Sequence, residues 1–183
     1  MTRVLVALGA HVTVLDVRTG ADIDSMVNDP AHHLRDRIKI VNGDVGDVKA
    51  VRECLNEGRF HVIFNFAAYA TVIEKAVEHP LDTIQANTMG LVNVLEAARA
   101  LKVRPTSIFH ASTDKVYGEM DGEPYEEEKT PLRGIGVYDG ANRAAAAFAR
   151  PTPPHSRSRS RLLRLGTLFG GAPPTARASL LPT

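Results

Sequence analysis

The chain has 183 residues, which is enough for one domain with a hydrophobic core and too few for two domains of ordinary size. A hydrophobic content of 44% and a charged content of 23% are typical of a soluble globular protein. No apolar run approaches the roughly 20 residues of a membrane span, and no signal peptide is recognisable, so we expect a cytoplasmic protein without a membrane partner.

The charge is unevenly distributed, although the formal net charge is only +1. All 21 acidic residues lie in the first 150 positions, whereas the last 33 contain five Arg, no acid and six of the 11 Pro. This contrast predicts a domain over residues 1–150 and a Pro/Arg-rich linker and tail over 151–183, partly disordered, with a candidate strand at 161–166. The tail lacks interleaved aromatic residues, so we expect no nucleic-acid partner.

Cysteine and histidine usage argues against a metal centre. Cys54 is the single cysteine, which excludes a disulfide framework within the chain and a thiolate cluster. Its expected role is a small buried side chain on a helix face. The seven histidines do not form metal-ligand spacing with carboxylates or cysteine, so we predict no metal.

Taken in chain order, short β-branched segments alternate with segments of helical periodicity. Strands are predicted at 11–16, 38–44, 61–68 and 107–112, and helices at 47–58, 81–101 and 138–150. Repeated strand–helix–strand order implies right-handed crossovers and a parallel sheet with helices on both faces. The predicted fold class is therefore α/β, a doubly wound parallel sheet of the Rossmann type.

The start of the chain departs from this pattern. A dinucleotide fold opens with a strand and a Gly-rich turn, followed about 20 residues later by an acidic residue. Asp16 would be that acid, but only 15 residues precede it. We therefore interpret residues 2–9 as the last turns of a helix that Gly9 ends as a C-cap, and expect an incomplete fold that lacks the first strand and the Gly-rich loop.

In open parallel sheets, ligands bind outside the carboxyl ends of the strands. Four places in the sequence follow a predicted strand directly and are therefore candidates for a binding edge: Asp16, Asp44, Ala67 to Tyr69, and Ser112 to Lys115.

Six stretches, in this order and spacing, resemble the NAD-dependent epimerase/dehydratase family of extended short-chain dehydrogenases/reductases, as a partial chain. They are "GAHVTVLD" at 9–16, "GDV" at 43–45, "FNFAA" at 64–68, "NTMGLVNVLEAAR" at 87–99, "STDKVYG" at 112–118 and "GVYDGAN" at 136–142. Any one of them is a weak signal, and their joint occurrence is a strong one. The resemblance covers about residues 2–150.

The resemblance implies NAD as the cofactor. A carboxylate at Asp16 would accept hydrogen bonds from the adenosine ribose and repel a 2′-phosphate, which favours NAD over NADP, although Arg18 weakens that preference. Asp44 and Val45 resemble the pair that flanks the adenine. The cofactor-binding residues implied by the resemblance further include Ala67 and Ala68, small where the backbone approaches the cofactor, together with Asn87 and Ser112.

The resemblance also implies chemistry on a nucleotide-diphosphate sugar, in a protein for which a homodimer is the expected assembly. Thr113 would hydrogen-bond the C4 hydroxyl and Tyr138 would take its proton as the hydride leaves for the nicotinamide. In the 4,6-dehydratase branch, Asp114 and Lys115 would then supply acid and base for the loss of water. This Asp-Lys pair resembles cytidine-diphosphate-sugar dehydratases, whereas epimerases usually carry small residues there.

Asn142 occupies the position of the family's lysine, four residues after Tyr138. A tyrosine has an ordinary pKa near 10, and a nearby cation lowers it by stabilising the phenolate. Asn142 brings no charge, so we predict strongly impaired hydride transfer even where NAD binds.

Three functions remain open from the sequence. The first is an NAD-dependent nucleotide-sugar epimerase or 4,6-dehydratase with impaired activity. The second is a non-catalytic nucleotide-binding or interaction protein built from a remnant of this fold. The third is a truncated product without independent function, because a sheet without its first strand exposes apolar edges.

Overall fold

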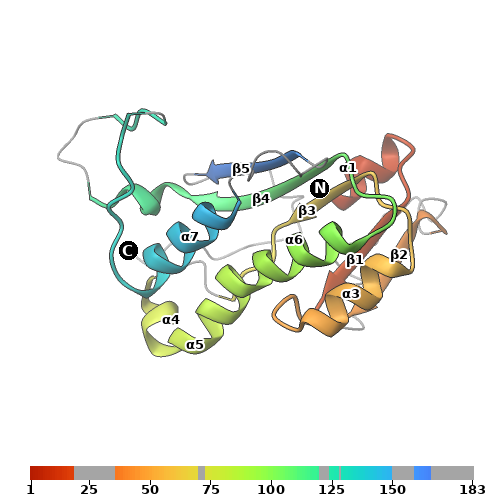
Figure 1. The fold of residues 1–183 in the computed structure, drawn as a ribbon, viewed down its shortest axis with the longest axis horizontal. Helices are drawn as coiled ribbons and strands as arrows, with labels where there is room; N and C mark the ends of the chain where they lie inside the picture. Colours follow the sequence, from red (N-terminus) through yellow and green to blue (C-terminus); the bar gives the residue numbers. More distant parts are fainter. Residues whose placement is uncertain (19–35, 70–72, 120–123, 128, 150–158, 166–183) are drawn as a thin grey trace, which may run out of the picture.

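The computed structural model describes residues 1–18, 36–69, 73–119, 124–127, 129–149 and 159–165 (Figure 1). Its strands are β1 (Val12–Asp16), β2 (Ile38–Asn42), β3 (Val62–Asn65), β4 (Ser107–Thr113) and β5 (Arg159–Leu165). Its α-helices are α1 (Thr2–Ala7), α3 (Val48–Asn56), α4 (Ile73–Glu78), α5 (Pro80–Thr83), α6 (Gly90–Ala100) and α7 (Val137–Phe148). A π-helix, η2, covers Ile84–Met89, and a 3₁₀-helix, η3, covers Asp114–Tyr117.

All the strand pairs are parallel, as predicted. β1 pairs with β2 from Val12 opposite Ile38 to Asp16 opposite Asn42. β4 lies between β3 and β5 in a second sheet of order β3-β4-β5. Within the described residues no strand joins β1 to β3, so each of these two strands has one edge without a strand partner.

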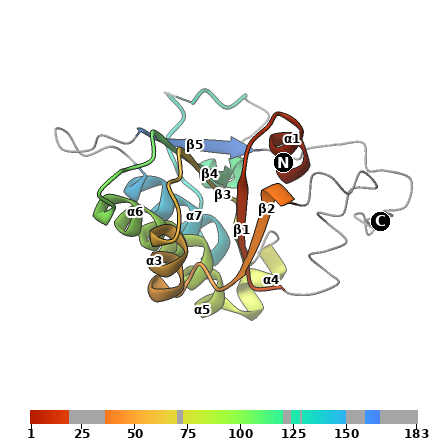
Figure 2. The same ribbon diagram turned by 90° about the vertical axis from the view of Figure 1, so that its right-hand side faces the viewer.

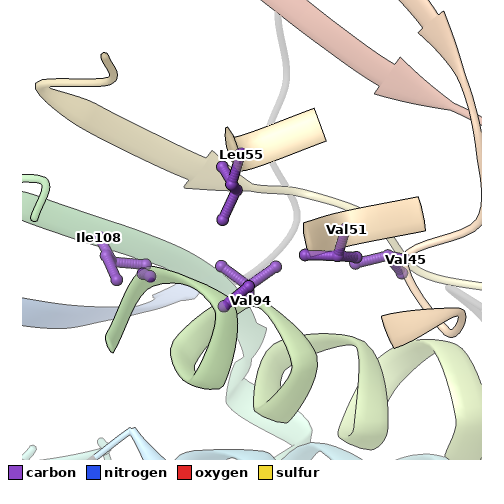
Figure 3. Packing of buried hydrophobic residues seen from close by; sticks show 7 residues of the cluster. Val45, Val51, Leu55, Val94 and Ile108 are labelled. Atoms are coloured by element: carbon purple, nitrogen blue, oxygen red, sulfur yellow. The ribbon is translucent and has the colours of Figure 1, made fainter. Parts of the chain in front are cut away.

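One hydrophobic core nevertheless unites the two sheets. Buried Val51 and Leu55 of α3 and Val94 of α6 pack together with Ile108 of β4 (Figure 3). Leu15 of β1 and Ile63 of β3 pack against this same cluster. The two sheets therefore share the face that α3 and α6 cover. α1 lies on the opposite side of β1 (Figure 2), which is the arrangement of a doubly wound sheet.

The interpretation of the first residues is confirmed. α1 is a short helix, and Gly9 follows it with a φ of 93°. This left-handed conformation is the one that glycine adopts at low cost just after a helix. The chain then enters β1 directly.

The predicted helix over 81–101 is present with an internal change of geometry. It begins as α5, continues as the six residues of η2 and ends as α6. The sequence gives no periodicity signal for η2, and α4 and η3 are also elements that the pattern did not predict. A π-helical turn inside an α-helix is rare and is found mostly at functional sites.

The remaining boundaries differ by a few residues. The strand predicted at 61–68 ends earlier, at Asn65, whereas β4 extends to Thr113. Where the candidate strand 161–166 was predicted, β5 covers Arg159–Leu165 and pairs along β4. The rest of the predicted linker and tail lies outside the described residues. None of the helices in the described part of the chain has the length and apolar character that a membrane crossing requires.

Candidate active site at the carboxyl edge of the sheet

The predicted site residues come from the ends of several strands and from α7. Because the strands within each of the two sheets are parallel, their carboxyl ends face one edge of that sheet. Asp16 is the last residue of β1, and Thr113 is the last residue of β4. Tyr138 is the second residue of α7, which packs against β4 and η3.

Thr113 and Tyr138 lie together, as the sequence motif implied. A side-chain hydrogen bond with Thr113 acts to lower the pKa of the Tyr138 phenol. Burial is the stronger effect and raises that pKa above its ordinary value of 10, and the charges of Asp139 and Asp114 act in the same direction. Tyr138 is therefore a protonated phenol at neutral pH, positioned beside a hydroxyl.

Asp114 and Lys115 begin η3 directly after β4. The Thr113 hydroxyl donates a 3.1 Å hydrogen bond to Oδ1 of Asp114, and the backbone N–H of Lys115 donates to that hydroxyl. Burial raises the pKa of Asp139, which the Lys115 charge opposes. Asp114, Lys115 and Asp139 thus place carboxylates and an ammonium around the Thr113–Tyr138 pair.

Asn142 turns its side chain back onto its own helix. Its amide nitrogen donates a 2.9 Å hydrogen bond to the backbone carbonyl of Tyr138, and the residue is buried. This carbonyl lies one helical turn before Asn142, at the base of the tyrosine and not at its phenol. The side chain that stands in the lysine position therefore contributes neither charge nor this hydrogen bond to the phenol.

Asp16 is held in place by Arg18. The guanidinium donates to both carboxylate oxygens, at 3.0 and 2.7 Å, and the backbone N–H of Arg18 adds a third bond at 3.0 Å. The side-chain hydrogen bond is the main reason that the pKa of Asp16 is lowered. Asp16 is consequently an oriented, ionised acceptor at the strand end.

Asp44 is exposed, whereas Val45 is buried. Oδ1 of Asp44 accepts a 2.7 Å hydrogen bond from the backbone of Gly46, which closes a tight turn after β2. The Val45 side chain is buried, and its carbonyl accepts from Asn93 of α6. The turn is therefore held to α6 through the Val45 carbonyl, and Asp44 lies on its exposed side.

Ala67 and Ala68 are exposed in the segment that follows β3. Two buried amides hold this segment: Asn65 accepts from the N–H of Ala67 at 3.3 Å, and Asn87 accepts from the N–H of Tyr69 at 2.9 Å. Asn87 lies in η2, so the π-helical turn places this acceptor beneath the strand end. Asn87, which the sequence predicts to bind the cofactor, therefore also holds the segment after β3 in place.

Ser112 is buried on β4, and its hydroxyl has no hydrogen-bond partner among the described residues. His110, two residues earlier and therefore on the same face of the strand, is also buried. His110 and Asn65 were not among the predicted site residues. The sequence feature that could have identified them is a polar residue in the middle of an apolar strand pattern, because a buried polar group needs a hydrogen-bond partner.

Metal ligation finds no support in the described part of the chain, where no group of three or more His, Cys, Asp or Glu side chains converges. Cys54 is buried in the core side of α3, and burial raises the pKa of its thiol, so its expected packing role is confirmed.

Comparison with known proteins decides the family. The profile of the GDP-mannose 4,6 dehydratase family matches residues 1–152. The chain belongs to this family of NAD-dependent epimerases and dehydratases. A dTDP-glucose 4,6-dehydratase from Mycolicibacterium smegmatis is 33% identical over 143 residues, which are 77% of this chain and 40% of the relative. A UDP-arabinose 4-epimerase from Arabidopsis thaliana is 31% identical over 137 residues, 75% of this chain and 32% of the relative.

Solved structures agree with the fold. A UDP-glucose 4-epimerase from Thermus thermophilus in complex with NAD superposes with a TM-score of 0.64 at 29% identity, covering 80% of this chain and 44% of that one. A dTDP-glucose 4,6-dehydratase from Streptomyces venezuelae, with NAD bound, reaches a TM-score of 0.71 at 24% identity, covering 89% and 50%. The chain spans less than half the length of the two curated relatives, 40% of the dehydratase and 32% of the epimerase.

Proposed function

We propose that this chain carries the cofactor edge and the catalytic strand end of an NAD-dependent nucleotide-sugar 4,6-dehydratase or 4-epimerase. The observation that carries the proposal is the contact between Thr113 and Tyr138. The two residues are 25 positions apart, in two of the family's motifs, and they lie together at the carboxyl end of β4. Asp16 is the last residue of β1, in the other parallel sheet. The names of the relatives support a UDP- or dTDP-linked sugar as the substrate class.

The residues present fit a dinucleotide at this edge. The carboxylate of Asp16 is ionised and partly exposed, with capacity to accept from ribose hydroxyls beyond its bonds to Arg18. The segment at Ala67 and Ala68 offers small side chains and an accessible backbone. NAD, when bound, supplies the acceptor for the hydride of the sugar.

The chain's own contribution to catalysis is the movement and holding of protons. Thr113 would hold a sugar hydroxyl beside the phenol of Tyr138, which would accept its proton. Asp114 and Lys115, one a carboxylate and the other an ammonium, would serve as the acid and base of water loss in a dehydratase. Because burial keeps Tyr138 protonated and Asn142 brings no cation to it, we propose that this chain performs the oxidation slowly.

Titration with NAD by isothermal calorimetry tests the proposed cofactor site. We expect saturable binding of NAD that is tighter than that of NADP, because the Asp16 carboxylate repels a 2′-phosphate. Asp16→Ala should weaken NAD binding about tenfold or more, as expected for hydrogen bonds to a charged acceptor. Asp36→Ala, an exposed carboxylate just before the amino end of β2, serves as the control and should leave binding unchanged. Absence of saturable NAD binding would overturn the proposal.

A further inference from the structure

Asn65 and His110 form a polar pair inside the β3–β4 ladder. They are directly opposite each other in the register, and the two residues are 4% and 2% exposed. The amide nitrogen of Asn65 and Nδ1 of His110 are 3.2 Å apart. Buried polar groups on neighbouring strands lower the stability of a core unless each is paired, so the pair calls for a role beyond packing.

The hydrogen bond at Ala67 determines how this pair is oriented. The backbone N–H of Ala67 can only donate, so the Asn65 atom that it contacts at 3.3 Å must be the amide oxygen. The other end of the amide, its NH₂ group, therefore faces His110. Because an NH₂ group can only donate, Nδ1 of His110 must be the acceptor, and the ring carries its proton on Nε2.

A neutral ring is also what the surroundings favour. Burial lowers the pKa of His110 to about 4, a shift that the backbone of Asn65 opposes. Nε2 has no hydrogen-bond partner among the described residues. The contact of Nδ1 with the Asn65 amide is therefore the one through which His110 can orient that side chain.

We propose that His110 is a positioning residue: as the neutral Nε2–H tautomer, it orients the Asn65 amide so that its oxygen holds the Ala67 segment at the cofactor edge. The part of this inference that concerns the cofactor rests on the proposed function. Its mechanism is indirect, because His110 lies within β4 and acts through Asn65 on the backbone that follows β3.

Two variants separate positioning from simple packing. In His110→Asn the side-chain oxygen takes the place of Nδ1 and still accepts from Asn65. In His110→Gln the amide extends toward the place of Nε2, and the acceptor at Nδ1 is lost. We expect amide hydrogen exchange at Ala67 to accelerate about fivefold in His110→Gln and to stay within twofold of the unmodified chain in His110→Asn, as for the loss of one hydrogen bond. The N–H of Thr106, bonded to His61 at the other end of the strands, is the internal control.

The ring tautomer is measured on the unmodified chain by long-range ¹H–¹⁵N NMR, which requires no variant to fold. An Nε2–H tautomer is expected, and an Nδ1–H tautomer would overturn the proposal. Equal rates of amide hydrogen exchange at Ala67 in the two variants would mean that His110 only packs against Asn65. This result would also overturn the proposal.

The NAD affinity completes the test. The dissociation constant should rise about fivefold in His110→Gln and be retained in His110→Asn. Faster exchange at Ala67 with unchanged NAD affinity would overturn the link to the cofactor. If the unmodified chain binds no NAD, the proposed function fails, and the exchange and tautomer measurements still decide whether His110 positions the segment.

Discussion

At the scale of single residues, Tyr138 lies between opposing influences. Burial and two nearby carboxylates favour the protonated phenol, whereas the hydrogen bond with Thr113 favours the phenolate. The position four residues later holds Asn142, whose amide is bonded to the Tyr138 carbonyl. The local balance therefore leaves the phenol with a raised pKa.

This balance predicts the titration of Tyr138. The phenol should lose its proton only above its ordinary pKa of 10, and Thr113→Val should raise the midpoint further by about half to one pH unit, since it removes one hydrogen bond to the phenolate. NMR of ¹³Cζ-labelled tyrosine measures the midpoint, with Tyr138→Phe for the assignment. Thr106→Val, which removes a hydroxyl bonded to the His61 carbonyl, is the matched control and should not move it. A midpoint below pH 10 in the unmodified chain would contradict this account.

The sequence predicts that Thr113 and Tyr138 lie together, but it does not predict the buried contact of Asn65 with His110. Thr113 and Tyr138 stand in motifs whose order and spacing carry the information, so their proximity could be expected. Asn65 and His110 lie in different strands, and their contact depends on the register of β3 against β4. Register is set by packing and strand pairing across the whole sheet, which a local pattern does not contain.

At the scale of elements, the segment around Gly134 packs against η3, the 3₁₀-helix that directly follows β4. The N–H of Gly134 donates a 3.0 Å hydrogen bond to the Val116 carbonyl. A Cβ added at Gly134 would lie 2.6 Å from the carbonyl oxygen of Lys115 and 3.2 Å from Cα of Val116. Both contacts are with backbone, which cannot move aside as a side chain can.

Gly134→Ala should therefore lower the free energy of unfolding by about 1–3 kcal/mol, as overpacking of a tight site does. Gly140→Ala is the matched control, because an added Cβ there meets nothing within 4 Å and the residue lies inside α7. It should raise the free energy of unfolding by up to about 1 kcal/mol, since alanine favours the helix. Urea denaturation measures both variants. Equal effects of the two substitutions would refute the packing of this loop against η3.

Strands and long helices were predictable because their periodicity is local. One long helix was predicted over 81–101, where the structure has α5, η2 and α6, but the π-helical middle, η2, was not predicted. Thr88 of η2 donates to the Ala141 carbonyl of α7, and Asn87 accepts from Tyr69. These tertiary bonds involve partners distant in sequence, which explains why no pattern in residues 84–89 foretells the widened turn.

At the scale of the whole molecule, two parallel sheets share one core, and the described residues leave one edge of β1 and one edge of β3 without a strand partner. A doubly wound order of the dinucleotide-binding kind would place one more strand between them. Asp16 and Thr113 end two strands, β1 and β4, that pack on the same hydrophobic cluster.

We propose that Tyr138 belongs to an oxidising site in which the tyrosine lacks its usual cation. This proposal is tested most directly by the rate at which reduced nicotinamide forms from NAD and dTDP-glucose, in the unmodified chain and in Asn142→Lys. We predict slow formation in the unmodified chain and an increase of about tenfold or more in Asn142→Lys, because an added ammonium lowers the pKa of Tyr138. The gain should vanish in the double variant that also carries Tyr138→Phe. An unchanged rate in Asn142→Lys, or a gain that survives the loss of the phenol, would contradict the claim.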